Sequence, residues 1–184
     1  MTSISIEAYH GTSGDAADAI LASSFNESAK KHEWLGCGIY FFVEGVSDPL
    51  ENAKEWAVAE ARKNPKTKKI AVLKSVVDID QDRIIDITEN QGLKNFNNFK
   101  EKCLDKIFDN FRIKSIPLNH HNCILFNFMV DTLGAHAVKH NLYIKSVRER
   151  KMQLRLNVPN TTVLCVKKAN FNSEVTKEYL GEIK

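Results

Sequence analysis

The sequence has no run of apolar residues long enough to cross a membrane. No stretch approaches the roughly 18 to 20 consecutive apolar residues that a membrane-spanning helix requires. Residues 1–7 (MTSISIE) also lack the basic start and the apolar stretch of a secretory signal. We therefore expect a protein of the cytoplasm that makes no use of a membrane.

Cysteines are few and are not arranged in pairs. The four cysteines, Cys37, Cys103, Cys123 and Cys165, are scattered, with no CxxC pair and no histidine at the spacing of a zinc finger. Such spacing suggests neither a disulfide framework nor a structural metal site, so we assign no metal. Buried free thiols are the simplest interpretation.

A strong excess of one charge is missing as well. The net charge is +3, which is too small to identify a nucleic-acid binder unless the charges cluster. Basic residues gather in 63–69 and again in 145–155, where the cations are Lys145, Arg148, Arg150, Lys151 and Arg155. The second cluster is a candidate for contacts with phosphate groups, although basic segments are also common on ordinary protein surfaces.

The first half of the chain shows clear patterns of secondary structure. Alternating apolar and polar residues predict a strand over 4–9, and apolar residues at helical spacing predict a short helix over 15–21. Residues 49–62 predict the best helix, with a proline at its start, strong helix formers and an arginine at its end. Residues 69–79 predict a β-branched central strand, and 83–87 a short partner strand.

The second half begins with a helical insertion over about residues 95–137. Its first helix carries an apolar stripe, and a second helical stretch covers 121–137; the stripe consists of Phe96, Phe99, Cys103, Ile107 and Phe111. Residues 141–147 and 161–167 predict late strands. This order of elements indicates an α+β fold with a mainly antiparallel sheet, in a single domain of residues 1–184.

Two short motifs follow the first predicted strand. Tyr9-His10-Gly11-Thr12 stands at its end, and Gly38-Ile39-Tyr40-Phe41 comes after the short helix, in an aromatic segment with two closely spaced glycines. The helix that contains Asn52 comes next. In this order the motifs resemble the NAD-binding half of the diphtheria-toxin-type, poly(ADP-ribose) polymerase-like ADP-ribosyltransferases, over about residues 6–57.

The resemblance implies a fold and a substrate. The fold is the ADP-ribosyltransferase-like split antiparallel β-sheet, here with the helical insertion at about residues 95–137. The substrate is NAD, from which nicotinamide is released through an oxocarbenium-like ribosyl cation. Holding NAD for this cleavage requires groups that clamp the carboxamide, stack on the nicotinamide ring and fix the ribose hydroxyls.

The resemblance also implies a role for each motif residue. His10 would hydrogen-bond a ribose hydroxyl of NAD, and the backbone of Gly11 would pair with the nicotinamide amide. Tyr40 would stack on the nicotinamide ring, and Thr12 would support the ribose. Asn52 lies near a position where relatives carry a small polar residue that contacts the amide. The implied cofactor-binding set is Tyr9, His10, Gly11, Thr12, Gly38, Tyr40 and Asn52.

A third catalytic group is harder to place. Relatives commonly carry a glutamate at the start of a late strand, but the matching strand here, 161–166 (TTVLCV), contains no acid or amide. Glu149 and Gln153 lie shortly before it, and we favour Glu149 because the flanking arginines keep a carboxylate ionised. The implied catalytic set is therefore His10, Tyr40 and Glu149, and the missing late-strand glutamate argues against polymer elongation.

These observations predict an NAD-dependent mono-ADP-ribosyltransferase acting on a macromolecular acceptor, either protein or nucleic acid (RNA or DNA). Stand-alone bacterial members of the superfamily commonly act as toxins or in phage defence, a role that would add an inhibitory antitoxin protein as a partner. The basic cluster at 145–155 favours a nucleic-acid acceptor slightly. Two other interpretations stay open: a non-catalytic module that binds NAD, ADP-ribose or a partner, and a chance occurrence of the motifs in an unrelated α+β domain.

Overall fold

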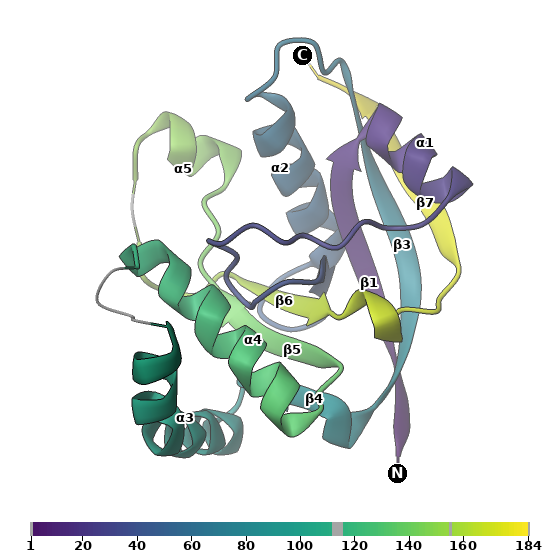
Figure 1. Ribbon diagram of the computed structural model, residues 1–184. Helices are drawn as coiled ribbons and strands as arrows, with labels where there is room; N and C mark the ends of the chain where they lie inside the picture. Colours follow the sequence, from purple (N-terminus) through teal and green to yellow (C-terminus); the bar gives the residue numbers. More distant parts are fainter. Residues whose placement is uncertain (1, 112–115, 155, 184) are drawn as a thin grey trace.

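A seven-stranded sheet forms the centre of the molecule (Figure 1). The computed structural model describes residues 2–111, 116–154 and 156–183, and for residues 107–111 it describes the backbone alone. The strands are β1 (Ser3–Ser13), β2 (Ile39–Val43), β3 (Lys69–Asp80), β4 (Ile84–Asp86), β5 (Ala137–Leu142), β6 (Thr161–Val166) and β7 (Val175–Glu182). Their order in the sheet is β4-β5-β6-β2-β1-β3-β7, antiparallel throughout except between β4 and β5. The predicted α+β class with a mainly antiparallel sheet is confirmed.

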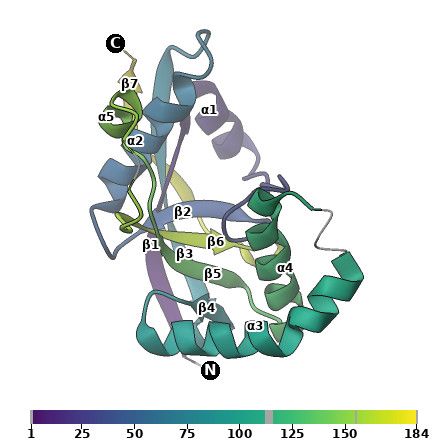
Figure 2. The ribbon, with the colours of Figure 1, turned by 90° about the vertical axis from the view of Figure 1, so that its left-hand side faces the viewer.

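The helices flank two regions of this sheet. They are α1 (Gly14–Ala22), α2 (Pro49–Ala61), α3 (Asn90–Phe111), α4 (His121–Leu133) and α5 (Val147–Lys151), with single 3-10 turns at Gln81–Arg83, Leu118–His120 and Lys168–Asn170. Helices α3 and α4 lie beside the β4 and β5 end, whereas α1 and α2 lie near β1 and β3 (Figures 1 and 2). No helix in the described part of the chain is both long and apolar enough to cross a membrane.

Side chains of the central strands alternate between two apolar clusters, as the period of a β-strand requires. One cluster contains Ala8, Phe41, Leu73 and Leu164, together with Ala17 of α1 and Phe25 of the α1–β2 connection. The other contains Tyr9, Phe42, Val72 and Val163, together with Ala53 of α2 and Phe126, Met129 and Val130 of α4. Helices α1 and α2 therefore cover opposite faces of the sheet, and the strands between them are buried on both sides.

Capping side chains fix where the first two helices begin. Ser13 ends β1, and its hydroxyl accepts a hydrogen bond from the backbone N–H of Ala16 at 3.2 Å. Asp48 caps α2 by accepting from the N–H of Glu51 at 2.8 Å, and Pro49 occupies the first helical turn. These local signals explain why both helices lie within two residues of their predicted bounds.

The late elements differ from the prediction. The strand expected over 141–147 lies instead at β5 (Ala137–Leu142), and Val147 begins α5. The reason is that Ile144 forms its backbone hydrogen bonds with the Asn160 side chain, at 2.9 and 3.0 Å, while Ser146 and Glu149 form a reciprocal capping box. Strand β7 was not predicted, because it pairs with β3 at a polar, exposed edge.

The predicted apolar stripe of α3 packs against α4 through its two phenylalanines whose side chains are described. Phe96 stacks on Phe126 with ring centroids 5.5 Å apart, and Phe99 lies against Phe128 at 6.3 Å. The side chains of Ile107 and Phe111 lie outside the described residues. All four cysteines are free thiols; Cys123 and Cys165 are buried, and Cys37 and Cys103 are half-buried.

Candidate functional site

The sheet opens between β1 and β2 at the two sequence motifs. These strands are paired at Ala8 with Val43 and at Tyr9 with Phe42, and no further pair joins them in the described residues. Beyond that point, residues 10–13 continue along β3, whereas residues 39–41 continue along β6. The backbone edge of residues 10–13 that faces β2 therefore has no ladder partner in the described residues and is available to a ligand. On the other side, Gly38 pairs with Ser28 in an isolated bridge, and the Tyr40 carbonyl accepts from His10.

A cavity of about 620 Å³ fills this opening. One wall is formed by His10, Gly11, Thr12 and Ser13 of β1, and the opposite wall by Gly38, Ile39, Tyr40, Phe41 and Phe42. The end of α2 and the connection that follows it contribute Trp56, Glu60, Ala61, Lys63, Asn64 and Thr67, and the loop before β2 contributes Asn26, Ser28, Lys30, His32, Glu33 and Trp34. Five residues of the predicted NAD-binding set, His10, Gly11, Thr12, Gly38 and Tyr40, thus lie around one space.

His10 bridges the opening with its side chain. Its Nδ1 lies 2.8 Å from the carbonyl oxygen of Tyr40, so Nδ1 carries the hydrogen and donates it. The ring also packs edge-on against Phe25 and Phe41, with centroids 5.1 and 6.0 Å away. Burial lowers the pKa of His10 below its ordinary value of 6.5, against a smaller opposing effect of the Tyr40 carbonyl. The neutral ring therefore keeps a lone pair on Nε2 that can accept a hydrogen bond.

The Tyr40 side chain is held by the loop that precedes β2. Its hydroxyl donates to the carbonyl oxygen of Gly36 at 2.6 Å and accepts from the backbone N–H of Leu35 at 2.9 Å. Burial raises the pKa of this hydroxyl far above its ordinary value, so it stays neutral. Both ends of the phenol are fixed, and the ring forms a rigid part of the cavity wall.

Asn127 of α4 fastens the same loop to β6. Its Oδ1 accepts from the backbone N–H of Cys37 at 2.8 Å and from Lys167 Nζ at 3.0 Å. Lys167 Nζ also donates to the carbonyl oxygen of Cys37 at 2.7 Å. This network, formed by Asn127 of α4 and by Lys167 directly after β6, sets the position from which β2 enters the cavity wall.

Both motif glycines are required by packing. A Cβ on Gly11 would lie 1.9 Å from the backbone oxygen of Ala53, and one on Gly38 would lie 2.4 Å from Cys165 Sγ. Gly11 therefore lets α2 approach β1, and Gly38 lets the start of β2 approach β6. The glycines keep the two cavity walls close to their supporting elements, whatever the ligand.

Two residues of the predicted NAD-binding set do not line the cavity. Tyr9 is buried on the face of the sheet that α2 covers, and its hydroxyl donates to the Glu7 carboxylate. Asn52 shares one helix face with Trp56 and Glu60, which do line the cavity, but it lies nearer the start of α2. Its amide donates to Ser47 Oγ at 2.8 Å, so it holds the β2–α2 connection.

The structure places Glu149 on α5, outside the residues that line the 620 Å³ cavity. One of its oxygens accepts from the backbone N–H of Ser146 at 2.8 Å, and the other accepts from the Tyr143 hydroxyl at 3.2 Å. The Ser146 N–H is the main cause that lowers the pKa of this carboxyl, more than the neighbouring cations. Gln153 is exposed, with a φ of 55°, and also lies outside the cavity lining.

Two carboxylates that the sequence analysis did not single out line the cavity instead. Glu33 accepts a hydrogen bond from the Ser28 hydroxyl, and Glu60 forms an ion pair with Lys63 at 2.5 Å. Trp56 and Glu60 are four residues apart and share one face of α2, and Lys63 follows three residues after Glu60, just beyond the end of the helix. This spacing is a signal that the sequence carries. Glu33 stands in an irregular loop, where no periodicity indicates its neighbours.

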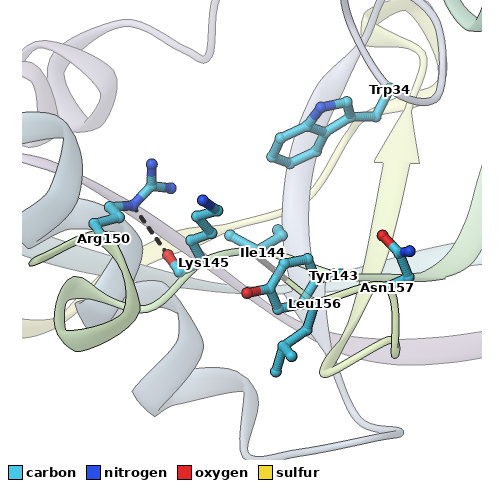
Figure 3. A pocket seen from close by; sticks show the side chains of 7 residues that line it. All are labelled: Trp34, Tyr143, Ile144, Lys145, Arg150, Leu156 and Asn157. Carbon is cyan, nitrogen blue, oxygen red and sulfur yellow. Dashed lines mark hydrogen bonds between the residues drawn. The ribbon is translucent and has the colours of Figure 1, made fainter. Parts of the chain in front are cut away.

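A second cavity of about 420 Å³ adjoins the first. It is lined by Trp34, Tyr143, Ile144, Lys145, Arg150, Leu156 and Asn157, and it shares Trp34 and Ile144 with the larger one. Figure 3 shows the indole of Trp34 on one side and Tyr143, Lys145 and Arg150 on the other. Two cations of the basic cluster thus belong to a cavity, while Arg155 lies outside the described residues.

Comparison with known proteins assigns no family to this chain. No protein-family model matches it, and no solved structure matches it. An uncharacterized protein of Methanocaldococcus jannaschii is 32% identical to it over 91 residues. That match covers 48% of this chain and 40% of the archaeal protein, so the chain spans well under two thirds of its relative. Because the relative is uncharacterized, the similarity adds no activity, substrate or partner.

Proposed function

We propose that this protein is an NAD-dependent mono-ADP-ribosyltransferase built on the split sheet of that superfamily. The observation that supports it best is the opening between β1 and β2. Residues 10–12 of one motif and 38–41 of the other, 26 or more residues apart in sequence, line one cavity there from the β1 side and the β2 side. A ligand pocket needs such a concave site with a few fixed polar groups.

The larger cavity offers each group that NAD requires. The free backbone edge of Gly11 pairs with the nicotinamide carboxamide, and the fixed ring of Tyr40 stacks on the nicotinamide. Nε2 of His10 accepts a hydrogen bond from a ribose hydroxyl, while the Thr12 hydroxyl supports the same ribose. These groups need little reorganisation when NAD binds, because His10 and Tyr40 are already held by the Tyr40 carbonyl and the Gly36 loop.

The reaction breaks the bond between C1′ of the ribose and the nicotinamide nitrogen, and the electron pair leaves with nicotinamide. An acceptor atom then forms a bond to C1′ and loses its proton. A carboxylate at the cavity wall stabilises the positive ribosyl group and takes that proton. We assign this role to Glu33, which lines the cavity, and we assign to Glu149 the support of Tyr143 and α5.

The test uses NAD labelled in its adenylate part. The purified protein is incubated with this NAD and a cell lysate, and both released nicotinamide and label in the protein, RNA and DNA fractions are measured. Tyr40→Ala is expected to lower nicotinamide release about tenfold or more, because it removes the stacking surface. Tyr179→Ala, on the β7 edge and outside both cavities, serves as the matched control. Thermal unfolding shows whether each variant is folded.

The same assay decides which carboxylate acts. Glu33→Gln keeps the size of the side chain and removes its charge, so we expect a loss of about 100-fold or more. A larger loss in Glu149→Gln than in Glu33→Gln would return the role to Glu149. NAD that raises the unfolding temperature without any release of nicotinamide would identify a non-catalytic binding module, and no shift at all would refute NAD binding.

A further inference from the structure

We propose that the smaller cavity receives the acceptor, and that the acceptor is a single-stranded nucleic acid. This inference rests on the proposed function, because it names the molecule to which ADP-ribose would be transferred. The cavity combines two aromatic side chains, Trp34 and Tyr143, with two cations, Lys145 and Arg150. No carboxylate is among its described lining residues.

The two aromatic rings are held in place from behind. Trp34 is 38% exposed, and its ring packs against Trp56 at 5.6 Å with an angle of 71° between the planes. The Tyr143 hydroxyl donates to Glu149, whose other oxygen is held by the N–H of Ser146. Figure 3 shows the two rings on different sides of the cavity. Fixed aromatic faces of this kind bind unpaired bases by stacking, regardless of sequence.

The two lining cations, Lys145 and Arg150, are placed to bind the phosphate groups of a bound strand. Arg150 Nε donates to the carbonyl oxygen of Lys145 at 3.0 Å, which holds the guanidinium at the cavity edge (Figure 3). No ion pair among the described residues uses Lys145 or Arg150, and the Glu149 carboxylate attracts Lys145 only as a minor interaction beside its hydrogen bonds to Ser146 and Tyr143. Arg148 and Lys151 of α5 are exposed but lie outside the lining of this cavity. Phosphate groups match this lining.

The remaining lining favours a base over an acidic peptide. Ile144 and Leu156 supply apolar surface for a flat ring, and Asn157 supplies an amide that can both donate and accept at a base edge. A base inside a duplex cannot enter between two side chains unless it is unstacked, so the strand must be single or locally opened.

The shared wall places this base beside NAD. Trp34 and Ile144 line both cavities, so a group in the smaller one borders the contents of the larger one. A ring nitrogen, exocyclic nitrogen or oxygen of the base attacks C1′ as the bond to nicotinamide breaks. The electron pair of that bond leaves with nicotinamide, and the proton of the attacking atom passes to Glu33 and then to water.

Binding is measured first, independently of any reaction. The probes are fluorescently labelled 20-nucleotide RNA and DNA strands of mixed sequence, the same strands as duplexes, and an abasic strand. We expect the single strands to bind, and Arg150→Gln and Lys145→Gln to weaken binding about tenfold each. Trp34→Ala should weaken binding of the base-containing strands and leave the abasic strand unaffected. Arg148→Gln, on the same helix but outside the cavity, is the matched control.

Transfer is measured next, with adenylate-labelled NAD and the same strands. We expect label on a single strand, with RNA and DNA compared directly, and a lower ratio of transferred label to released nicotinamide in Arg150→Gln than in Arg148→Gln. Nicotinamide release with label in the protein fraction alone would leave the proposed function intact and overturn this inference. A raised KM for NAD in Arg150→Gln without any strand would also overturn it, because the cavity would then hold part of NAD. Strand binding without nicotinamide release would instead refute the transferase and keep the nucleic-acid site.

Discussion

Replacing Gly11 with alanine would place a methyl carbon 1.9 Å from the backbone oxygen of Ala53 and 2.8 Å from its carbonyl carbon. Carbon and oxygen atoms in ordinary contact are more than 3 Å apart, so α2 and β1 must separate by about 1 Å or more. The buried side chains between them, Tyr9, Ala53 and Val72 among others, would lose contact. Overpacking of this kind costs about 3 kcal/mol, which corresponds to a fall of roughly 6 to 12 °C in the Tm of a domain of this size.

Urea unfolding followed by circular dichroism measures this loss. Gly14→Ala is the control, because the nearest atom to its new Cβ is the Lys69 Cβ at 3.1 Å and a helical alanine is intrinsically favoured; we expect a change below about 1 kcal/mol. Adding Ala53→Gly to Gly11→Ala should give no rescue, since the clash involves the carbonyl oxygen of residue 53 and not its methyl group. A Gly11→Ala protein within about 0.5 kcal/mol of the parent would refute the close approach of α2 and β1.

Three further predictions concern buried polar groups and one strained turn. Burial lowers the pKa of His10 and of His140 below 6.5, so below this pH the unfolded chain binds protons more readily than the folded chain does. The free energy of unfolding should therefore be highest above pH 7 and should decrease as the pH falls through 6.5. Denaturation at pH 7.5, 6.5 and 5.5 measures this decrease, which should be smaller in His140→Leu. Asn127→Leu should cost about 1 to 3 kcal/mol and speed hydrogen exchange at the Cys37 amide, which loses its acceptor; unchanged exchange would contradict the network. Gly134→Ala should cost about 1 kcal/mol in the same unfolding assay because its φ is +60°, and a stabilised variant would contradict this turn.

The elements with local signals could be predicted from the sequence. Helices α1 and α2 carry their capping side chains beside them, and β1 and β3 show their apolar pattern over enough residues to be recognised. The pair Ser146 and Glu149 also had the spacing of a capping box, which would have indicated a helix in place of the strand expected over 141–147. Strand β7 carries no such pattern, because its partner β3 supplies the ladder while its own side chains are largely exposed.

The candidate site likewise has a part that could be predicted from the sequence and a part that could not. The walls of the larger cavity are the two motifs themselves, so sequence order was sufficient to select His10, Gly11, Thr12, Gly38 and Tyr40. Other lining residues, such as Glu33, Ile144 and Val163, are brought there by tertiary contacts, and no spacing in the chain relates them. The choice of Glu149 rested on its sequence neighbours, whereas its position depends on the capping box and on Tyr143.

The bridge from His10 to the Tyr40 carbonyl makes the tautomer of the imidazole a property of the fold. Where β1 and β2 part, this bond takes over from the backbone ladder, and it holds the hydrogen on Nδ1. A ligand that needs a hydrogen from Nε2 must either protonate a ring whose pKa is lowered by burial or break the link between the strands. Beside Nε2 of His10 the cavity therefore favours ligand groups that donate a hydrogen bond, such as sugar hydroxyls. It disfavours groups that only accept one, such as phosphate oxygens.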